Sequence, residues 1–375
     1  MKKKRRGGLF KVAVIFITAA VFVRVLSGGE IEEKAELYAR ALSQNEGFLR
    51  YAFSNETQLI KRADAAEGIS RLAAESAFVA QNTTKEEMAE EPSGEREELT
   101  VWEYNPNGEK TANTYPVKNI TISPKSEKGY VRYKNIWVKN DSTKGIDLKW
   151  LSSASLPFKL SGKGPKVLIV HTHGSEAYFP QGKENYTLTD VERTSDKRYN
   201  VIRVGDELAK VLEENGISVV HDRNIYDSPS YNGSYTRTLD AIGQALRKNP
   251  SIKVVIDVHR DAMTDSDGTK YRTVADVDGK RCAQMMLVMS TGESGLPHPD
   301  WAENLKLAVK LQDAMASKYP DIMRPINLRK ERFNMHATRG SMLVEVGTSA
   351  NSVGEALESV RLLGKELSAI LKTAK

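Results

Sequence analysis

Histidine and glutamate residues follow three apolar runs of this 375-residue chain. The run KVLIV leads into the stretch HTHGSEAY, which contains His171, His173 and Glu176. The run KVVIDV is followed by His259, and the run SMLVEV contains Glu345. Imidazole nitrogens and carboxylate oxygens are ligands that Zn²⁺ takes in proteins. The three stretches together therefore indicate a zinc site.

Three of these side chains form the predicted ligand set: His173, Glu176 and His259. Gly174 and Ser175 let the chain turn between the first two ligands, so that both can reach one ion. Two neutral imidazoles and one carboxylate leave the ion with a net positive charge and an open position for water. This arrangement is typical of a catalytic zinc.

Two further residues are predicted to act on the substrate. Glu345 is the candidate base that takes a proton as a zinc-activated water attacks a carbonyl group. Arg260, beside the third ligand, is the candidate group that holds a substrate carboxylate or polarises the scissile carbonyl. The site as a whole predicts hydrolysis at a carbonyl group.

His171 has more than one interpretation. Alternation along a strand places it on the same side as His173, so it is predicted to support the ligands from behind, to carry protons or to replace a ligand. A histidine at a strand end is also often a hydrogen-bonded structural residue. This structural interpretation is applied to the three remaining histidines, which are His221, His298 and His336.

These side chains need a fold that brings the ends of distant strands together. From about residue 162, strand-like runs alternate with amphipathic segments, which predicts an α/β fold with a mostly parallel sheet flanked by helices. Such folds bind ligands at the carboxyl ends of their strands. The predicted strands are 166–170, 217–220, 253–258, 284–289 and 341–346. The predicted helices are 201–216, 234–249, 301–319 and 352–372.

The N-terminus predicts a membrane anchor. Five basic residues, Lys2 to Arg6, precede an apolar run whose uncharged part lies between Lys11 and Arg24. Residues 9–26 can cross a bilayer if the flanking side chains reach its surface. A cleaved signal peptide is the alternative, but no small-residue cleavage site follows the run. Positive residues stay cytoplasmic, so the rest of the chain is expected outside the cell membrane.

The same segment explains the basic composition. The chain has a formal net charge of +6, but residues 1–29 hold seven basic residues and no acidic one. The remainder is close to neutral, so a sequence pI near 9.0 does not indicate nucleic-acid binding. The single cysteine, Cys282, lies in an apolar run and is expected to be a buried thiol.

Composition also suggests a division into units. The acidic stretch 85–98 lacks apolar residues other than Met and Ala and is interpreted as a solvated linker, whereas short β-like runs follow it. The predicted units are a cytoplasmic tail (1–8), the transmembrane anchor (9–26), an exterior helical and linker region (27–99), a small β-like arm or module (100–161) and the catalytic domain (162–375).

The motifs resemble those of zinc-dependent N-acetylmuramoyl-L-alanine amidases. In that family one strand ends in a ligand histidine followed by glycine, a later strand ends in a second ligand histidine, and a last strand ends in E-x-G. The stretches HTHGSEAY, IDVHRDAM and LVEVGT are more specifically similar to the stage II sporulation protein P family, over roughly residues 162–375. Where the broader family has its ligand carboxylate, this chain has Asn200, so Glu176 is predicted to replace it.

The resemblance implies a peptidoglycan hydrolase with a zinc cofactor. It implies cleavage of the amide between N-acetylmuramic acid and the stem peptide, together with cross-link endopeptidase activity, in septal wall remodelling and engulfment during endospore formation. It also implies stage II sporulation proteins D and M as partners, and a single-pass location in the septal or forespore-engulfing membrane. A metallocarboxypeptidase and a non-catalytic sporulation scaffold with a structural zinc are the alternatives.

Overall fold

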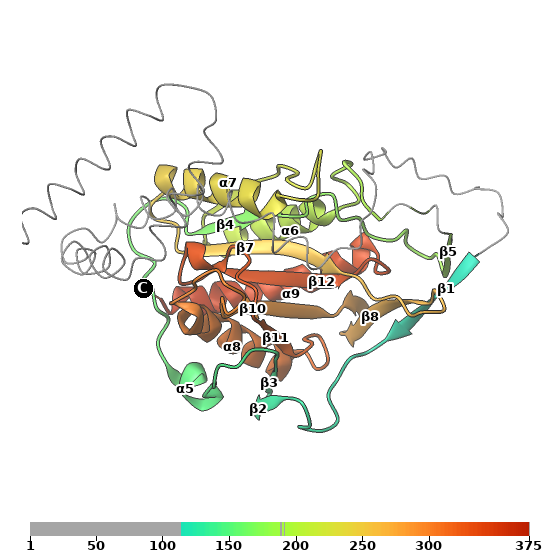
Figure 1. Cartoon of the computed structure of the whole chain (residues 1–375), viewed down its shortest axis with the longest axis horizontal. Coiled ribbons are helices and arrows are strands. Elements are labelled where there is room, and N and C mark those ends of the chain that lie inside the picture. The colour runs from blue at the N-terminus through green and yellow to red at the C-terminus, as the bar shows by residue number, and fades with distance from the viewer. Residues whose placement is uncertain (1–113, 188–189, 191, 375) are drawn as a thin grey trace, which may run out of the picture. The chain divides into compact units, whose positions relative to one another are not determined.

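A computed structural model describes residues 114–187, 190 and 192–374 of the chain. These residues form an eight-stranded sheet with helices on both faces (Figure 1). Its strand order is β2-β3-β11-β10-β12-β7-β4-β6. The strands are β2 (Val131–Tyr133), β3 (Ile136–Asn140), β4 (Val167–Val170), β6 (Val219–His221), β7 (Val254–Asp261), β10 (Met285–Ser290), β11 (Ile326–Arg329) and β12 (Met342–Thr348).

The strand directions confirm the predicted α/β class. β4, β7 and β12 are parallel neighbours in the middle of the sheet, so their carboxyl ends meet at one edge. β3, β11 and β10 are also parallel to one another. β10 runs antiparallel to β12, and β2 runs antiparallel to β3, which makes the sheet mixed.

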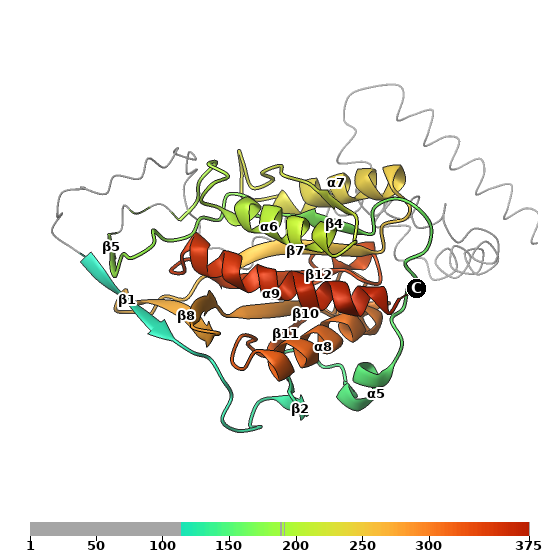
Figure 2. The ribbon, with the colours of Figure 1, turned by 180° about the vertical axis from the view of Figure 1, so that it is seen from behind.

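Alternate residues of the central strands face two different helical layers. Val167 and Ile169 belong to the large core that α6, α8 and α9 cover, whereas Leu168 and Val170 pack with α7. Figure 2 looks onto α9, α6 and α8, and α7 lies behind them in that view. Burial on both faces explains why these strands are continuous apolar runs. The helices are α6 (Val201–Glu214), α7 (Ser234–Lys248), α8 (Trp301–Lys318) and α9 (Val353–Lys372).

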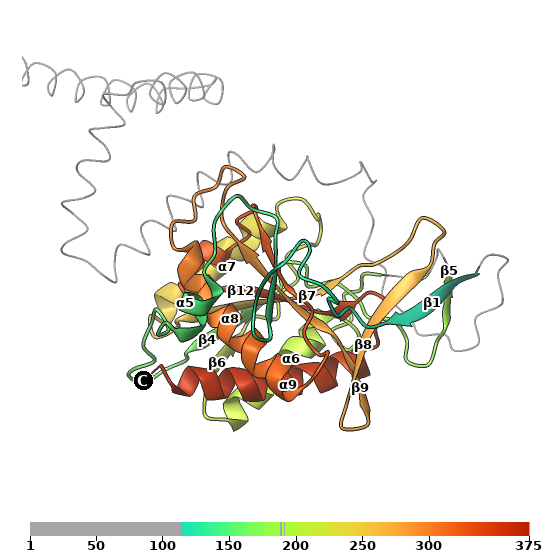
Figure 3. The same ribbon diagram turned by 90° about the horizontal axis from the view of Figure 1, so that it is seen from below.

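A second sheet of four strands lies at one end of the described part of the chain (Figure 3). Its order is β5-β1-β8-β9. β8 and β9 form a hairpin whose two turn residues, Asp278 and Gly279, both have positive φ, as an Asp-Gly hairpin turn requires. The strands are β1 (Thr114–Ile120), β5 (Asn185–Thr187), β8 (Lys270–Val277) and β9 (Lys280–Ala283).

The segment before the predicted catalytic domain contributes to both sheets. β1 pairs with β8, and β3 pairs with β11 and extends the main sheet. A short helix, α5 (Leu148–Ser153), then packs against α8. The boundaries proposed at residues 100 and 162 stay predictions.

Two other sequence predictions have different outcomes. Cys282 is buried and free, as expected. The predicted anchor, residues 9–26, lies outside the described residues, as does the helical and linker region 27–99. Within the described part of the chain, none of the helices has both the length and the apolar character needed to span a bilayer.

Candidate metal centre

The chain turns directly after β4, and this turn carries His173 and Glu176. The Glu176 amide donates to the His173 carbonyl oxygen over 3.1 Å. Gly174 packs closely on a neighbouring loop, where an added Cβ would lie 3.0 Å from the Asn224 carbonyl oxygen and 3.1 Å from the Ile225 Cα. A larger residue would push the turn away from this loop, which explains the glycine between the two predicted ligands.

Neighbouring parallel strands carry His259 and Glu345. His259 in β7 and Glu345 in β12 are register partners, and both side chains line one cavity. The regular pairing of β12 breaks after Glu345, and Gly347 has a φ of 72°. A Cβ on Gly347 would lie 2.8 Å from Asn351 Oδ1. Both constraints explain the glycine of the E-x-G motif.

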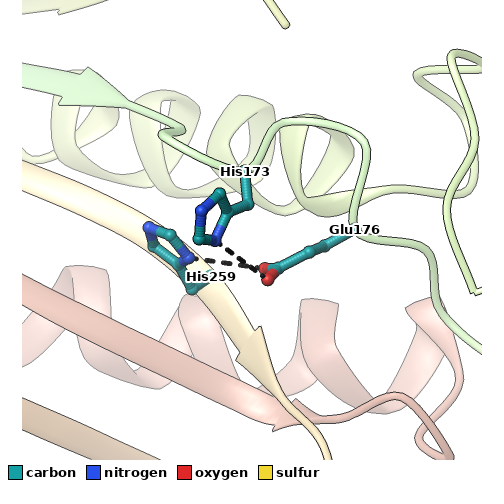
Figure 4. Close-up of side chains that lie close together, drawn as sticks. All are labelled: His173, Glu176 and His259. Atoms are coloured by element: carbon teal, nitrogen blue, oxygen red, sulfur yellow. Dashed lines mark ion pairs between the residues drawn. The ribbon is translucent and has the colours of Figure 1, made fainter. Parts of the chain in front are cut away.

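His173, Glu176 and His259 form a buried cluster (Figure 4). One donor atom from each side chain lies within 4.8 Å of the other two. The Glu176 carboxylate lies 3.5 Å from Nδ1 of His173 and 3.5 Å from Nδ1 of His259. His173 Nε2 is buried and makes no hydrogen bond with the described residues. Two imidazoles and a carboxylate at this spacing fit a Zn²⁺ ion.

The charges around the cluster favour a cation. Burial raises the pKa of Glu176, but His259, His173 and Arg260 outweigh burial and hold this pKa well below its ordinary value. Burial lowers the pKa of His259, but the carboxylates of Asp257 and Glu176 outweigh it and raise this pKa well above its ordinary value. Carboxylates that stabilise a proton on an imidazole also attract a metal ion to it.

Asp257 is a candidate functional residue that the sequence interpretation missed. Its Oδ1 lies 2.9 Å from His259 Nε2 and accepts the Thr172 amide at 2.8 Å. Its Oδ2 accepts the Thr172 hydroxyl at 2.5 Å. A carboxylate held in this way orients a ligating histidine. The signal was present in KVVIDVH, because Asp257 stands two residues before His259 and therefore on the same face of the strand.

His171 is not part of the cluster, and its predicted role as a supporting residue or alternative ligand stays a prediction. Its Nδ1 donates to the Val258 carbonyl oxygen over 2.9 Å, and its Nε2 lies 2.8 Å from His221 Nε2. Burial is the main cause that lowers the pKa of His171 to about 3. The predicted alternation fails because β4 ends at Val170 and the chain turns before it reaches His173.

Arg260 supports the cluster through the backbone. Its guanidinium donates to the carbonyl oxygens of Ala177 and Glu192 over 3.1 and 2.8 Å, and its amide donates to Glu176 Oε2 over 3.0 Å. The side chain is buried. These contacts favour a positioning role for Arg260 over the predicted contact with the substrate, because they hold the turn that carries Glu176.

Glu345 lies beside the cluster in a cavity of about 480 Å³. Burial is the main cause that raises its pKa to about 8, and the carboxylates of Asp261 and Glu176 add to it while His259 opposes it. Glu345 Oε2 is buried and makes no hydrogen bond with the described residues. A carboxyl group with this pKa can take up and release a proton near neutral pH.

Two tyrosines, Tyr231 just before α7 and Tyr235 in its first turn, pack on His173. The Tyr231 ring stacks on His173 with centroids 4.3 Å apart, and the Tyr235 ring meets His173 edge-on at 5.5 Å. The guanidinium of Arg193 also lies over the Tyr231 ring, 4.6 Å from its centroid. These rings limit the movement of His173 and line the cavity beside the cluster.

Asn200, at the position where the amidases carry a ligand carboxylate, has a structural role. Its Oδ1 caps α6 by accepting the Ile202 amide at 3.1 Å, and its Nδ2 donates to the Thr194 carbonyl oxygen over 3.0 Å. Both polar atoms are therefore engaged at the helix start. Glu176 is the carboxylate that lies between the two histidines.

Solved amidase structures show a distant likeness to this chain. The amidase AmiC2 of Nostoc punctiforme has a TM-score of 0.30 and 13% identity, and covers 56% of this chain and 98% of its own. The CwlD amidase of Clostridioides difficile, solved in complex with the GerS lipoprotein, has a TM-score of 0.33 and 12% identity, with 56% and 98% coverage. These values carry no conclusion about the chemistry of this chain.

Sequence comparisons are more specific. Stage II sporulation protein P of Bacillus subtilis (strain 168) is 28% identical over 210 residues, which are 53% of this chain and 49% of that protein. The chain thus matches about half the length of this curated relative. The family model for stage II sporulation protein P matches residues 49–368, most of the chain. The chain belongs to the stage II sporulation protein P family.

Proposed function

We propose that this chain is a zinc-dependent N-acetylmuramoyl-L-alanine amidase that hydrolyses peptidoglycan during sporulation. The observation that carries the proposal is the buried cluster of His173, Glu176 and His259, with the high-pKa carboxyl of Glu345 beside it and a cavity open to both. Family membership supports a role in sporulation.

Different residues of the site bind the metal, transfer the proton and position the ligands. His173, Glu176 and His259 would hold the zinc, which when bound supplies a Lewis acid and lowers the pKa of water. Glu345 Oε2 takes the proton of the attacking water and passes it to the nitrogen of the leaving amine. Asp257 keeps His259 in its orientation. The tyrosines that cover His173 keep bulk water from the cluster.

The same residues could act on a second type of bond. A peptide cross-link presents the same carbonyl group flanked by an amide nitrogen, so we propose that endopeptidase activity accompanies the amidase activity. The proportion of the two activities depends on how the cavity receives each substrate.

The setting of the reaction is proposed from the sequence. Residues 9–26 would anchor the chain in the septal or forespore-engulfing membrane, with the catalytic residues outside, because basic residues precede the apolar run. Stage II sporulation proteins D and M are the proposed partners. Cross-linking of the full-length protein in sporulating cells, followed by mass spectrometry, tests both partners.

The decisive experiment compares the full-length protein with His173→Ala, His259→Ala and Glu345→Gln. Bound zinc is measured by elemental analysis, and products released from purified sacculi are identified by mass spectrometry. We expect the wild type to release free stem peptides, the histidine variants to lose zinc and activity, and Glu345→Gln to keep zinc without activity. Glu213→Gln, which removes an exposed carboxylate of α6, is the matched control and should change neither quantity.

The same experiment separates the alternatives. A metallocarboxypeptidase would release single C-terminal residues instead of whole stem peptides. A scaffold with structural zinc would bind zinc but release nothing, and Glu345→Gln would leave its biological role intact. Absence of zinc from the wild type together with full activity would overturn the proposed mechanism.

A further inference from the structure

The cavity beside the metal centre continues across the main sheet as a groove. Leu343 of β12 is the register partner of Val288 in β10, Val288 is the partner of Asn327 in β11, and Asn327 is the partner of Lys139 in β3. All four residues line the cavity, so they form one row on one face of the sheet. The row begins beside Glu345, two residues from Leu343 on the same strand, and ends at Lys139 on β3, next to the edge strand β2.

The length of this row matches a short extended peptide. Neighbouring strands lie about 4.8 Å apart, so three steps from β12 to β3 span roughly 14 Å. An extended chain covers about 3.3–3.6 Å per residue, and four residues therefore span nearly the same distance. A substrate whose scissile amide lies at the metal centre would place its fourth residue near Lys139.

The chemistry of the groove changes along the row. Leu343, Val288 and Met286 provide an apolar floor next to the metal centre. Asn327 follows, and its Oδ1 is buried without a hydrogen-bond partner among the described residues. A buried acceptor of this kind costs free energy until a donor reaches it. A peptide N–H is such a donor.

An exposed lysine lies at the outer end of the groove. Lys139 is 55% exposed at the side chain, and its pair with Asp141 at 3.3 Å is a surface pair that contributes little. The cavity as a whole is lined by five arginine or lysine side chains and three carboxylates. Arg193, Arg324 and Arg329 are paired with the carboxylates of Asp227, Asp261 and Glu331, so exposed Lys139 is the cation that the row offers to a substrate. A peptide end can supply the matching carboxylate, whereas glycan sugars carry no charge once the muramic acid is in amide linkage.

We propose that this row binds the peptide portion of the substrate. Asn327 Oδ1 accepts a peptide N–H, and Lys139 binds a carboxylate about four residues from the scissile amide. The inference rests on the proposed function, because that function places the scissile bond at the metal centre. It predicts selection of substrates by peptide length and by the charge at the peptide end.

Binding to the full-length Glu345→Gln protein tests the groove without turnover. The probes are a synthetic N-acetylmuramoyl tetrapeptide with a free C-terminal carboxylate, the same peptide with a C-terminal amide, and the corresponding dipeptide, measured by isothermal titration calorimetry. We expect the tetrapeptide acid to bind about two- to fivefold more tightly than its amide, because an exposed ion pair contributes up to about 1 kcal/mol. The dipeptide should bind no better than the amide.

Lys139 and Asn327 are then substituted, each in the Glu345→Gln protein, to assign the selection of peptide ends to single residues. Lys139→Ala should abolish the difference between acid and amide, and Lys139→Arg should keep most of it. Asn327→Leu should weaken the acid and the amide equally. Lys149→Ala removes an exposed charge of α5 and is the matched control, which should leave all affinities unchanged.

Two outcomes overturn the inference. One is equal affinity for acid and amide in the parent protein, and the other is a difference that survives Lys139→Ala. Displacement of the tetrapeptide by a peptide-free glycan fragment would assign the groove to sugar and also overturn it. Failure of the proposed function looks different: wild type would release nothing from sacculi while the tetrapeptide still bound in a Lys139-dependent way.

Discussion

Two pairs of buried histidines lie side by side in this fold, and they differ in what surrounds them. The rings of His173 and His259 have centroids 5.0 Å apart, and those of His171 and His221 have centroids 5.1 Å apart. Both pairs meet edge-on. The first pair has the buried carboxylates of Glu176 and Asp257 against it, whereas the carboxylate nearest the second pair, that of Asp206, lies at the surface beside His221.

The pKa values show the effect of this difference. Two buried carboxylates outweigh burial and raise the pKa of His259 well above its ordinary value. Burial prevails in the other pair, and the pKa is lowered to about 3 for His171 and about 4 for His221. Proximity of two histidines therefore does not make a cation site. The buried carboxylate between them does.

The largest effect is expected from Glu176→Gln. The change keeps the shape of the side chain but removes its charge, and an amide is a poor zinc ligand. We expect zinc affinity to fall by more than about 100-fold. Competition with a chromophoric chelator measures it. Asp206→Asn beside the other pair is the matched control, and an equal loss of zinc in that variant would erase the distinction between the two pairs.

A smaller loss of zinc affinity, about 10- to 100-fold, is expected from Asp257→Asn. The amide can no longer attract the His259 ring as a carboxylate does, although the ligands themselves remain. Zinc affinity is read together with thermal unfolding, since Asp257 also holds Thr172. Asp276→Asn on the exposed side of β8 should alter neither. Unchanged zinc affinity in a well-folded Asp257→Asn protein would remove Asp257 from the metal centre.

Gly205→Ala tests the second pair through packing. An added Cβ would lie 2.6 Å from Nε2 of both His171 and His221. Alanine favours a helix by up to about 1 kcal/mol, but the overpacking is expected to cost roughly 1–3 kcal/mol and to prevail. The free energy of unfolding in urea should therefore decrease, while the folded protein keeps its zinc.

The matched control for this change is Gly243→Ala in α7, where the nearest atom to the added Cβ is the mobile end of Arg247 at 3.4 Å. That variant should be stabilised by roughly 0.5–1 kcal/mol. Stabilisation by Gly205→Ala as well would mean that the pair of His171 and His221 is loosely packed.

A further effect is a slope in the pH dependence of stability. The native pKa of His221 is about 4, below its ordinary value of 6.5. Between these pH values the unfolded chain binds a proton that the native chain does not, so the free energy of unfolding decreases as the pH falls from about 6.5 to about 4. One group contributes at most about 1.4 kcal/mol per pH unit. His221→Gln should flatten this slope in urea titrations, and an unchanged slope would contradict the assignment.

The sequence predicted the central elements because they are buried on both faces. The apolar runs before His173 and His259, and the run around Glu345, are strands β4, β7 and β12 within three residues of the predicted bounds. Parallel neighbours then bring their ends together, as predicted. The four predicted helices also agree closely with α6 to α9.

Other elements had weaker signals. β8 and β9 carry many polar residues, and only the Asp278-Gly279 turn marks their hairpin. β11 has four residues, too few to show a period. The direction of β10 depends on its pairing with β12, which no local pattern contains. His171 was misplaced because alternation was extended past the end of β4, and Asp257 was overlooked inside an apolar run.

A fragment that began at residue 162 would remove β1, β2 and β3 from the fold. β11 would then become an outer strand with unpaired backbone groups, and the shielding that β3 gives to the fully buried Ile326 and Leu328 would be lost. Such edges pair with other chains and aggregate. Soluble expression of residues 162–375 is therefore expected to require a start before Thr114, and insolubility of shorter fragments would reflect the missing strands rather than an intrinsic property of the protein.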